Sequence, residues 1–288
     1  NNAIVIRVTD GVDITEQVYT LIVSLDIIVD AGGGGDYVTI QEGINAAIDG
    51  DVISIYPGTY TENVDFQGKD LRVNGDPSDP SQVIIDGNNS GPCVKFVSGE
   101  PSSAVLNGVT LSNGSGHLGV LSTDNLHSPA SGYYGGGIFI SASNPTLRNL
   151  VIKNNQLQQN NNHGGSGAGI SIRKGSNVLI EGTVSIFKIE ANTSNIYRGG
   201  GICVDDSELT IKNTNITANH AGNYGGGIAL YNSILNISNV NITGNNVNGN
   251  NGNGGGIYSH NSTVNQGVGV TISGNSASEG NNDLHVYP

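Results

Sequence analysis

The chain of 288 residues contains no tryptophan, no methionine and only two cysteines, Cys93 and Cys203. Aromatic residues make up 5% of the sequence and charged residues 12%, which excludes a thick core built on aromatic rings. No apolar run reaches the roughly 18 residues that indicate a membrane-spanning helix. The lack of methionine predicts that residue 1 is not a natural start and that the chain is a processed product or an excised segment.

Positive charge is also scarce, and the negative charge is unevenly placed. The formal net charge is −13, and residues 1–130 hold 17 Asp and Glu against 4 Lys and Arg, whereas residues 131–288 hold 7 of each. An acidic chain without a basic stripe argues against nucleic acid as a partner. Solvated surface charge is the favoured interpretation of the acidic half. No cofactor is expected, and a bound Ca²⁺ ion is an open alternative that no motif indicates.

Glycine, in contrast, is abundant and marks a repeat. Of 44 glycines, triplets or near-triplets begin at Gly135, Gly167, Gly199, Gly225 and Gly254. Each is followed by an alternating pair expected to face inward: Ile138/Ile140, Ile170/Ile172, Ile202/Val204, Ile228/Leu230 and Ile257/Ser259. Each coil later carries an asparagine three residues after an apolar one: Asn155, Asn192, Asn219, Asn245 and Asn275. Strands stacked at about 4.8 Å predict a parallel β-helix in which these asparagines form a ladder.

The repeat GGGI followed by I-T-x-N, over residues 135–288, resembles the repeats of polymorphic outer-membrane proteins and other bacterial surface adhesins. The stretch GDYVTIQEGINAAIDGDVISIYPGTYTENV resembles the opening of many secreted proteins of the pectin-lyase-like superfamily. The resemblance implies an all-β fold, a right-handed parallel β-helix with three strands per coil, and an extracellular or cell-surface location. It implies no particular activity, because this fold hosts lyases, hydrolases, adhesins and structural proteins.

Residues 1–25 differ from the rest, with two alternating strands around Asp10 and Gly11. They resemble the last β-hairpin of a cadherin-like or immunoglobulin-like domain. Two strands do not form a stable sandwich alone. Two interpretations remain open: a remnant of, or link to, a preceding domain, and an edge hairpin that pairs with another chain.

Residues 26–288 are expected to form a single β-helix that begins with a cap helix over residues 39–48. Thr39 is a suitable N-cap and Glu42 completes a capping box. The apolar face of that helix is predicted to contain Ile40, Ile44, Ala47 and Ile48. Irregular coils follow over residues 51–130, with a long loop at 114–134, and the GGGI repeats occupy residues 135–288.

Stacking predicts which side chains are neighbours on the outer surface. One outward row is predicted to contain Phe139, Ser171, Cys203, Ala229 and Tyr258, with Lys95 before them. Further along the strands, Arg173 and Lys174 are expected one rung from Asp205 and Asp206. A lyase would use a basic residue to abstract a proton and acids to hold a cation, and a glycosidase would use the two carboxylates as an acid–base pair. The favoured interpretation is a cross-rung salt bridge.

Aromatic residues collect near the glycine triplets. Together with one arginine and one histidine they could line a carbohydrate-binding groove: Tyr133, Tyr134, Tyr197, Arg198, Tyr224, Tyr231 and His260. The alternative is a surface stack that covers turn backbone, with Arg198 against a ring. No metal site is expected, because no His or Cys cluster with ligand spacing is present. Cys93 and Cys203 are predicted three coils apart, beyond disulfide reach, and therefore free.

These patterns favour a secreted or cell-surface, non-catalytic β-helix: an adhesin, a spacer or a self-assembling structural protein, with glycan binding as an additional role. The alternative is a polysaccharide-active enzyme, such as a uronate-polymer lyase or a glycosidase. Against the alternative, the sequence has one small charged cluster where such lyases carry a dense run of Asp, Lys and Arg. The expected partners are polysaccharide and a second copy, joined through hairpin 1–25 and the open C-terminal coil.

Overall fold

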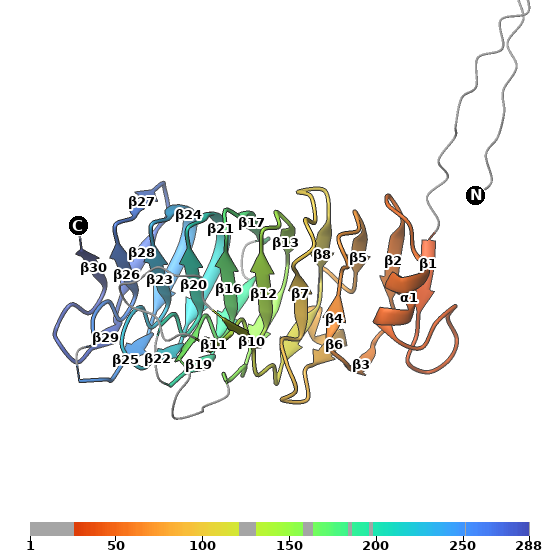
Figure 1. The fold of residues 1–288 in the computed structure, drawn as a ribbon, viewed down its shortest axis with the longest axis horizontal. Helices are drawn as coiled ribbons and strands as arrows, with labels where there is room; N and C mark the ends of the chain where they lie inside the picture. Colours follow the sequence, from red (N-terminus) through yellow and green to blue (C-terminus); the bar gives the residue numbers. More distant parts are fainter. Residues whose placement is uncertain are drawn as a thin grey trace, which may run out of the picture.

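The computed structural model describes residues 26–120, 131–157, 164–183, 186–195, 198–250 and 252–287. The predicted hairpin at residues 1–25 and the side chain of Tyr197 lie outside the described residues. Within the described ranges the strands stack along one axis, and the predicted fold class, a parallel β-helix, is confirmed (Figure 1).

One side of the helix, called face 1, is a sheet of eight parallel strands. Its strands are β4 (Val64–Asp65), β7 (Val94–Phe96), β12 (Ile138–Ser141), β16 (Ile170–Arg173), β20 (Ile202–Asp205), β23 (Ile228–Tyr231), β26 (Ile257–His260) and β30 (Leu284–Tyr287). The pairs predicted to face inward are fully buried, from Ile138 and Ile140 through to Ile257 and Ser259. This face therefore begins directly after each glycine triplet, as the repeat predicts.

The second and third sides, called face 2 and face 3, belong to one 15-stranded sheet because β21 (Glu208–Thr217) and β24 (Ile234–Thr243) run across the corner between them. Face 2 also contains β1 (Asp26–Val29), β2 (Val52–Ile55), β5 (Arg72–Asn74), β8 (Val105–Asn107), β13 (Thr146–Arg148), β17 (Asn177–Glu181) and β27 (Thr263–Gln266). Face 3 also contains β3 (Gly58–Thr61), β6 (Val83–Asp86), β9 (Thr110–Ser112), β14 (Val151–Lys153), β18 (Lys188–Glu190) and β28 (Thr271–Ser273).

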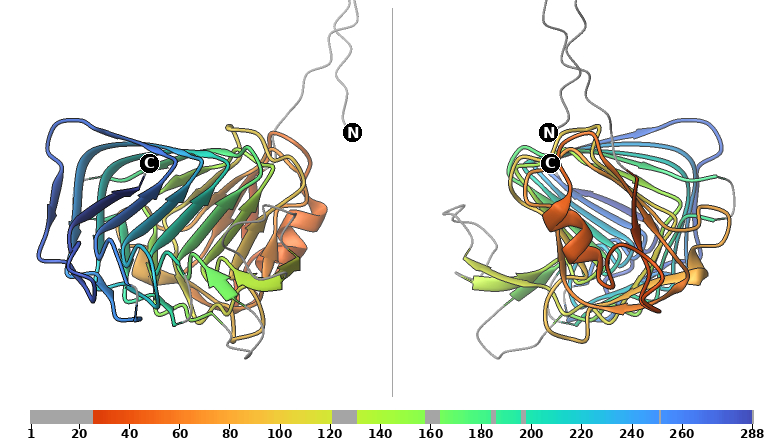
Figure 2. Two further views of the ribbon diagram at one scale, coloured as in Figure 1. Left: turned by 60° about the vertical axis from the view of Figure 1, so that its left-hand side comes forward. Right: turned by 90° about the vertical axis from the view of Figure 1, so that its right-hand side faces the viewer.

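Short segments complete the coils. A four-stranded sheet contains β19 (Thr193–Ser194), β22 (His220–Ala221), β25 (Asn246–Val247) and β29 (Ser276–Ala277). A three-stranded sheet contains β10 (His117–Val120), β11 (Ser131–Tyr134) and β15 (Gly164–Ser166), and η1 spans Pro80–Gln82. The pairing of β10 with β11 is antiparallel, so the segment predicted as a loop at residues 114–134 includes a paired hairpin stem that projects from the solenoid (Figure 2).

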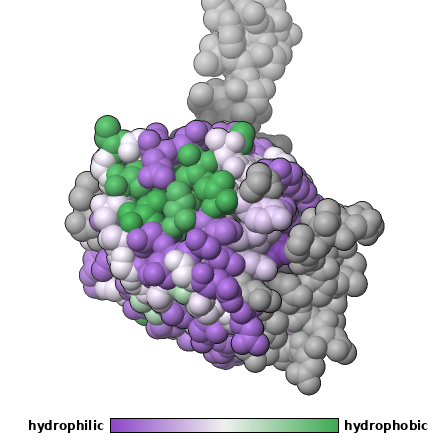
Figure 3. Space-filling view, turned by 90° about the vertical axis from the view of Figure 1, so that its left-hand side faces the viewer, coloured by the Kyte–Doolittle hydropathy of each residue, from purple (hydrophilic) through white to green (hydrophobic). Residues whose placement is uncertain are grey.

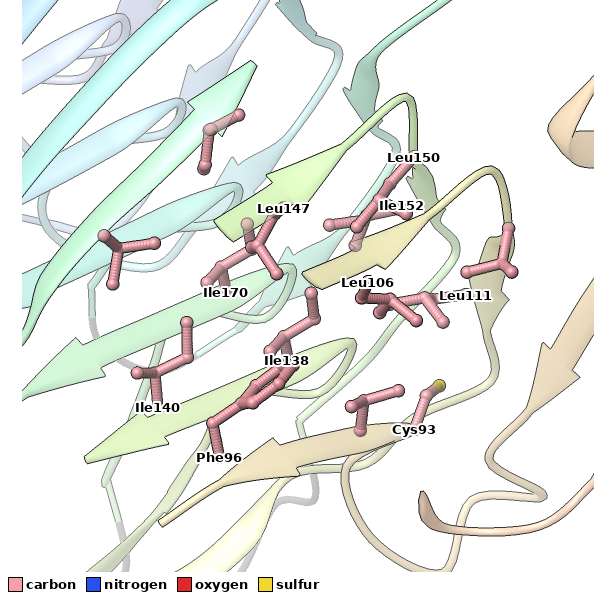
Figure 4. Close-up of a cluster of buried hydrophobic side chains, with 14 of the residues drawn as sticks. Cys93, Phe96, Leu106, Leu111, Ile138, Ile140, Leu147, Leu150, Ile152 and Ile170 are labelled. Carbon is pink, nitrogen blue, oxygen red and sulfur yellow. The ribbon is translucent and has the colours of Figure 1, made fainter. Parts of the chain in front are cut away.

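Inside the coils, aliphatic side chains from the three faces meet in one continuous core. Figure 4 shows Ile138 and Ile140 of face 1 among Leu147 and Ile152 of the other faces, and all four are fully buried. Phe66, Phe96 and Phe187 are the largest fully buried side chains, and they add a few rings to a core that is otherwise mostly aliphatic.

Helix α1 (Ile40–Ala46) lies at the N-terminal end of the β-helix (Figure 2). The predicted capping box is present, since Thr39 Oγ1 accepts from the Glu42 backbone N and Glu42 Oε2 accepts from the Thr39 backbone N. Ile40, Ile44 and Ala47 are buried as predicted, but Ile48 is 51% exposed. The helix ends at Ala46 and Ala47 is extended, so residue 48 leaves the helical periodicity and the apolar face.

The five asparagines expected to form a ladder hydrogen-bond one another from coil to coil. Each Nδ2 donates to the Oδ1 of the next rung, at 2.9 Å from Asn155 to Asn192 and 3.0 Å from Asn192 to Asn219. Asn219 to Asn245 and Asn245 to Asn275 repeat the contact at 3.0 and 2.9 Å. Glycine is required beside the ladder, because a Cβ on Gly137 would lie 2.6 Å from the Gly169 carbonyl oxygen of the next coil.

Candidate functional site

The outer surface of face 1 holds the residues singled out from the sequence, but its predicted outward row is covered. Phe139, Ser171, Cys203, Ala229 and Tyr258 are each at most 7% exposed. They are absent from the main core and belong in part to a second, small cluster of Cys203, Ala229, Tyr231 and Tyr258, against which Tyr224 packs. The row therefore points away from the lumen, as predicted, without reaching solvent.

The cover comes from the residues that precede the glycine triplets. Tyr134, Ser166, Arg198, Tyr224 and Asn253 pair in parallel from coil to coil. The first glycine of each triplet has a positive φ, 60° at Gly135 and 60° at Gly199, which turns the chain back over the strand that follows. Side chains before the triplet consequently lie on the outward row of that strand.

Arg173 and Asp205 occupy neighbouring rungs of face 1, as the register predicted, and form an ion pair. Arg173 Nη2 lies 2.9 Å from Asp205 Oδ2, and the two side chains are 13% and 17% exposed. The Arg173 guanidinium also lies over the Tyr134 ring, 4.3 Å from its centroid. Carboxylate and ring together hold the guanidinium in place, which is the salt-bridge alternative rather than a free catalytic base.

Lys174 and Asp206 are positioned differently, at the turn that leaves face 1. Both have left-handed backbone, with φ of 58° and 46°, and both side chains are exposed. Asp206 Oδ1 accepts from Asn232 Nδ2 at 3.1 Å. Because Asp205 and Asp206 bond to different neighbours, the two carboxylates do not converge as an acid–base pair.

Arg198 stacks on Tyr231, with 3.9 Å from its guanidinium carbon to the ring centroid. Tyr231 is 6% exposed, and its hydroxyl has no hydrogen-bond partner among the described residues. Burial raises the pKa of Tyr231 well above its ordinary value, with the positive charge of Arg198 opposing the shift. Arg198 thus lies against a ring, as the second interpretation of the aromatic residues proposed.

The remaining rings stack on one another along the axis. Tyr258 lies 5.4 Å from His285 at an interplanar angle of 10°, and His260 lies 5.1 Å from Tyr287 at 15°. Tyr224 and Tyr258 are 4.6 Å apart. A sugar stacks on an open ring face, and here the faces largely cover one another, while Tyr133 is half-buried. The open ring surface is concentrated at the last rung, where Tyr287 is 53% exposed.

A second polar group lies on face 1 nearer the N-terminus. Lys95 Nζ is 3.0 Å from Asp65 Oδ2, with side chains 34% and 26% exposed. His117 of β10 stacks on Phe139 at 4.8 Å between centroids, and burial, followed by the charge of Lys95, lowers the pKa of His117. Extending the outward row by one more rung would have found Asp65, but His117 belongs to the β10–β11 hairpin, which no repeat landmark marks.

The two thiols are free and buried. β7, β12, β16 and β20 pair in that order, so Cys93 and Cys203 lie three rungs apart, as predicted. Burial raises the pKa of Cys93 to about 12 and that of Cys203 to about 11. Both sulfurs are therefore protonated and poorly reactive in the folded chain at neutral pH.

No group of three or more His, Cys, Asp or Glu side chains in the described ranges is placed to hold a metal ion. None of the described helices has the length and apolar character needed to cross a membrane. The expectations that the chain takes no cofactor and binds no nucleic acid stay predictions.

No family model matches the chain, and no curated protein matches it either. Among solved structures, it is similar to a pectin methylesterase from carrot, at 16% identity and a TM-score of 0.37, over 94% of this chain and 90% of that one. YbhC of Escherichia coli gives 15% identity and a TM-score of 0.33, over 97% and 82% of the two chains. A pectin methylesterase from Aspergillus niger gives 14% and 0.30, over 89% and 93%. Similarity at this level says nothing about activity, and the likeness to polymorphic outer-membrane proteins stays a prediction.

Proposed function

We propose that the chain is a non-catalytic β-helical scaffold of an extracellular or cell-surface protein, of the adhesin or spacer type. The observation that supports this most is the Arg173–Asp205 ion pair, closed at 2.9 Å and mostly buried. These are the two residues of the charged cluster that the register brings together on one strand face. Each side chain therefore has its charge balanced by the other and is largely withdrawn from solvent.

The chemistry of the alternatives supports the same proposal. A general base needs a lone pair within hydrogen-bond reach of the proton that it abstracts. The Arg173 guanidinium donates to Asp205 and is covered by Tyr134. Lys174 and Asp206 remain exposed, but they lie at a corner, and Asp206 is bonded to Asn232.

Scaffold character follows from the way the coils are joined. Every strand of face 1 between β7 and β26 is hydrogen-bonded on both sides, and the asparagine ladder adds a polar seam inside the coils. Long contacts of this kind resist bending and local opening. Polysaccharide contact is included in the proposal as a surface role, at the ring of Tyr287 on the last rung, which is 53% exposed.

The experiment is a turnover and binding panel on the intact chain. Pectins, alginates and neutral polysaccharides are incubated with the protein, and unsaturated product and new reducing ends are measured alongside binding in affinity gels. We expect no turnover and, for at least one polymer, retardation that Tyr287→Ala weakens. The proposal would be overturned by turnover that is lost in Arg173→Ala and kept in Lys174→Ala, provided that the circular dichroism spectrum of Arg173→Ala matches that of the parent protein.

An enzyme remains the second candidate because of Lys95, Asp65 and His117. An ammonium–carboxylate pair and an imidazole with a lowered pKa share one accessible face. A neutral imidazole near pH 7 is a competent general base. Turnover in the panel that is lost in His117→Ala and in Lys95→Ala, but kept in Arg173→Ala, would favour this candidate over the scaffold.

A further inference from the structure

The C-terminal end of the solenoid exposes side chains that face the lumen. In β30, Leu284 is 37% and Val286 is 58% exposed, whereas their neighbours one coil earlier, Ile257 and Ser259, are fully buried. Val264, Val270 and Ile272 are only partly buried at the same end. Figure 3 shows the apolar patch that results, surrounded by polar residues. A patch of this kind indicates a contact surface.

The same end exposes backbone hydrogen-bonding groups. β30 is the edge strand of face 1, paired only with β26 in the eight-stranded sheet. The carbonyl oxygens of Asp283 and Tyr287 accept from Ile257 N and Asn261 N, at 2.8 and 3.0 Å. Residues of a parallel strand bond to alternate sides. The N–H and C=O groups of Leu284 and Val286 therefore point to the open edge.

The other end of the molecule does not fit this surface. Helix α1 lies over the N-terminal coil, with Ile40 and Ile44 fully buried against it. Residues 26–100 also contain 13 Asp and Glu against 3 Lys and Arg. The C-terminal coil, residues 252–287, contains Glu279 and Asp283 and no Lys or Arg. The acidic N-terminal end, called the head, therefore finds no positive charge to pair with at the C-terminal end, called the tail.

The asparagine ladder also changes at this end. Asp283 stands where the earlier coils have the third glycine of the triplet, as at Gly256. Its Oδ1 accepts from the Asn275 backbone N at 3.2 Å and from Asn275 Nδ2 at 2.9 Å. It occupies the position of the next ladder asparagine. An ionised carboxylate accepts but does not donate, so Asp283 does not repeat the donor role of the ladder asparagines.

We propose that this end binds the same end of a second copy, tail to tail, by antiparallel pairing of the two β30 strands. In the fitting register Leu284 lies opposite Val286 of the second copy, and His285 lies opposite His285 of the second copy. The outward-pointing backbone groups then exchange hydrogen bonds, and lumen-facing residues meet lumen-facing residues. A slip of one residue would set lumen-facing against outward-facing side chains. The contact is isologous and closes at two copies.

A cysteine at residue 285 tests the register. His285 is a non-hydrogen-bonded pair with its symmetry mate, at a Cα separation of about 4.5 Å, which a disulfide spans. We expect His285→Cys to give a reductant-sensitive dimer under mild oxidation. The matched control Tyr287→Cys, whose mate lies about 13 Å away along the strands, should not cross-link. Equal cross-linking of both variants would overturn the proposal, and the buried native thiols do not interfere.

The association itself is measured by sedimentation of the unmodified chain over a range of concentrations. We expect a reversible dimer whose dissociation constant rises at least tenfold in Val286→Lys. Ile234→Lys, which places the same charge on an exposed apolar site of face 2, should leave it unchanged. A monomer at every concentration would overturn the proposal. So would loss of the dimer on removal of residues 1–25, because association would then run through the predicted hairpin.

Discussion

Cys203 lies between Ser171 and Ala229 in the outward row of face 1, and it is 4% exposed. Its pKa, about 11, is raised first by burial and then by the charge of Asp205, against the opposing charges of Arg198 and Arg173. Burial therefore outweighs two nearby cations. The thiol fills the space between the small side chains of Ser171 and Ala229 on the neighbouring rungs.

This raised pKa predicts an alkaline decline in stability. Below pH 9, the ordinary value, the thiol is protonated in both states and its contribution is fully present; between pH 9 and about 11 only the folded chain keeps the proton. Cys203→Ala introduces the residue type that Ala229 supplies on the next rung. It should reduce the loss in free energy of unfolding over this pH range by on the order of 2 kcal/mol. Urea unfolding at pH 7, 9 and 11 measures it, and parallel curves for both proteins would refute the assignment.

At the scale of the element, the asparagine ladder supplies polar contacts that the aliphatic core does not. Asn219 Nδ2 donates to Ile189 O at 2.8 Å and to Asn245 Oδ1 at 3.0 Å, while Asn219 Oδ1 accepts from Asn192. Asn219 is fully buried, so each of these groups lacks water as a substitute partner.

Replacing Asn219 with Leu should cost roughly 1–3 kcal/mol in the free energy of unfolding, because buried partners are left unpaired. Asn241→Leu is the matched control: Asn241 Nδ2 donates to Asn215 Oδ1 at 2.9 Å in an exposed ladder. That change should cost well under 1 kcal/mol. Equal losses in chemical denaturation would show that burial does not distinguish the two ladders.

Helix α1 is held at both ends by residues of the coils. The Glu62 carboxylate accepts from the backbone N of Ile40 and of Gln41, both at 2.9 Å. Lys69 Nζ donates to the carbonyls of Ile44, Asn45 and Ala47 at 2.6, 3.1 and 2.8 Å. The charges suit the ends of the helix dipole.

Glu62→Gln should loosen this cap, because an amide offers one acceptor oxygen where two are used. We expect faster amide exchange across residues 40–46, equivalent to about 1 kcal/mol, with exchange in β23 unaltered. Unchanged protection of α1 would mean that the helix is stable without the hydrogen bonds to the Glu62 carboxylate.

The repeat landmarks predicted the coils because glycine triplets and buried asparagines recur once per turn and have few other uses. The inward pairs and the capping box follow from local periodicity and were predicted residue by residue. The side chains that cover the outward row were not predicted. They depend on the chain reversal at Gly135 and Gly199, which adds a layer that period-two alternation does not encode. The position of His117 and the exposure of Ile48 depend on similar local departures from the repeat.

At the scale of the whole molecule, the two ends differ in a way that matters for its use. The head carries a helix and most of the negative charge, and the tail carries an open strand and an apolar patch. Between them the sides are hydrogen-bonded throughout, with few exposed charges. The proposed tail-to-tail contact would use this open strand and apolar patch.

The charged pair on face 1, Arg173 and Asp205, is expected to stabilise the coils. The most direct measurement is a double-mutant cycle with Arg173→Met and Asp205→Asn, followed by urea unfolding of the four proteins. At side-chain exposures of 13% and 17% we predict a coupling energy of about 1–2 kcal/mol in favour of the pair. A coupling energy of zero within error would contradict the account.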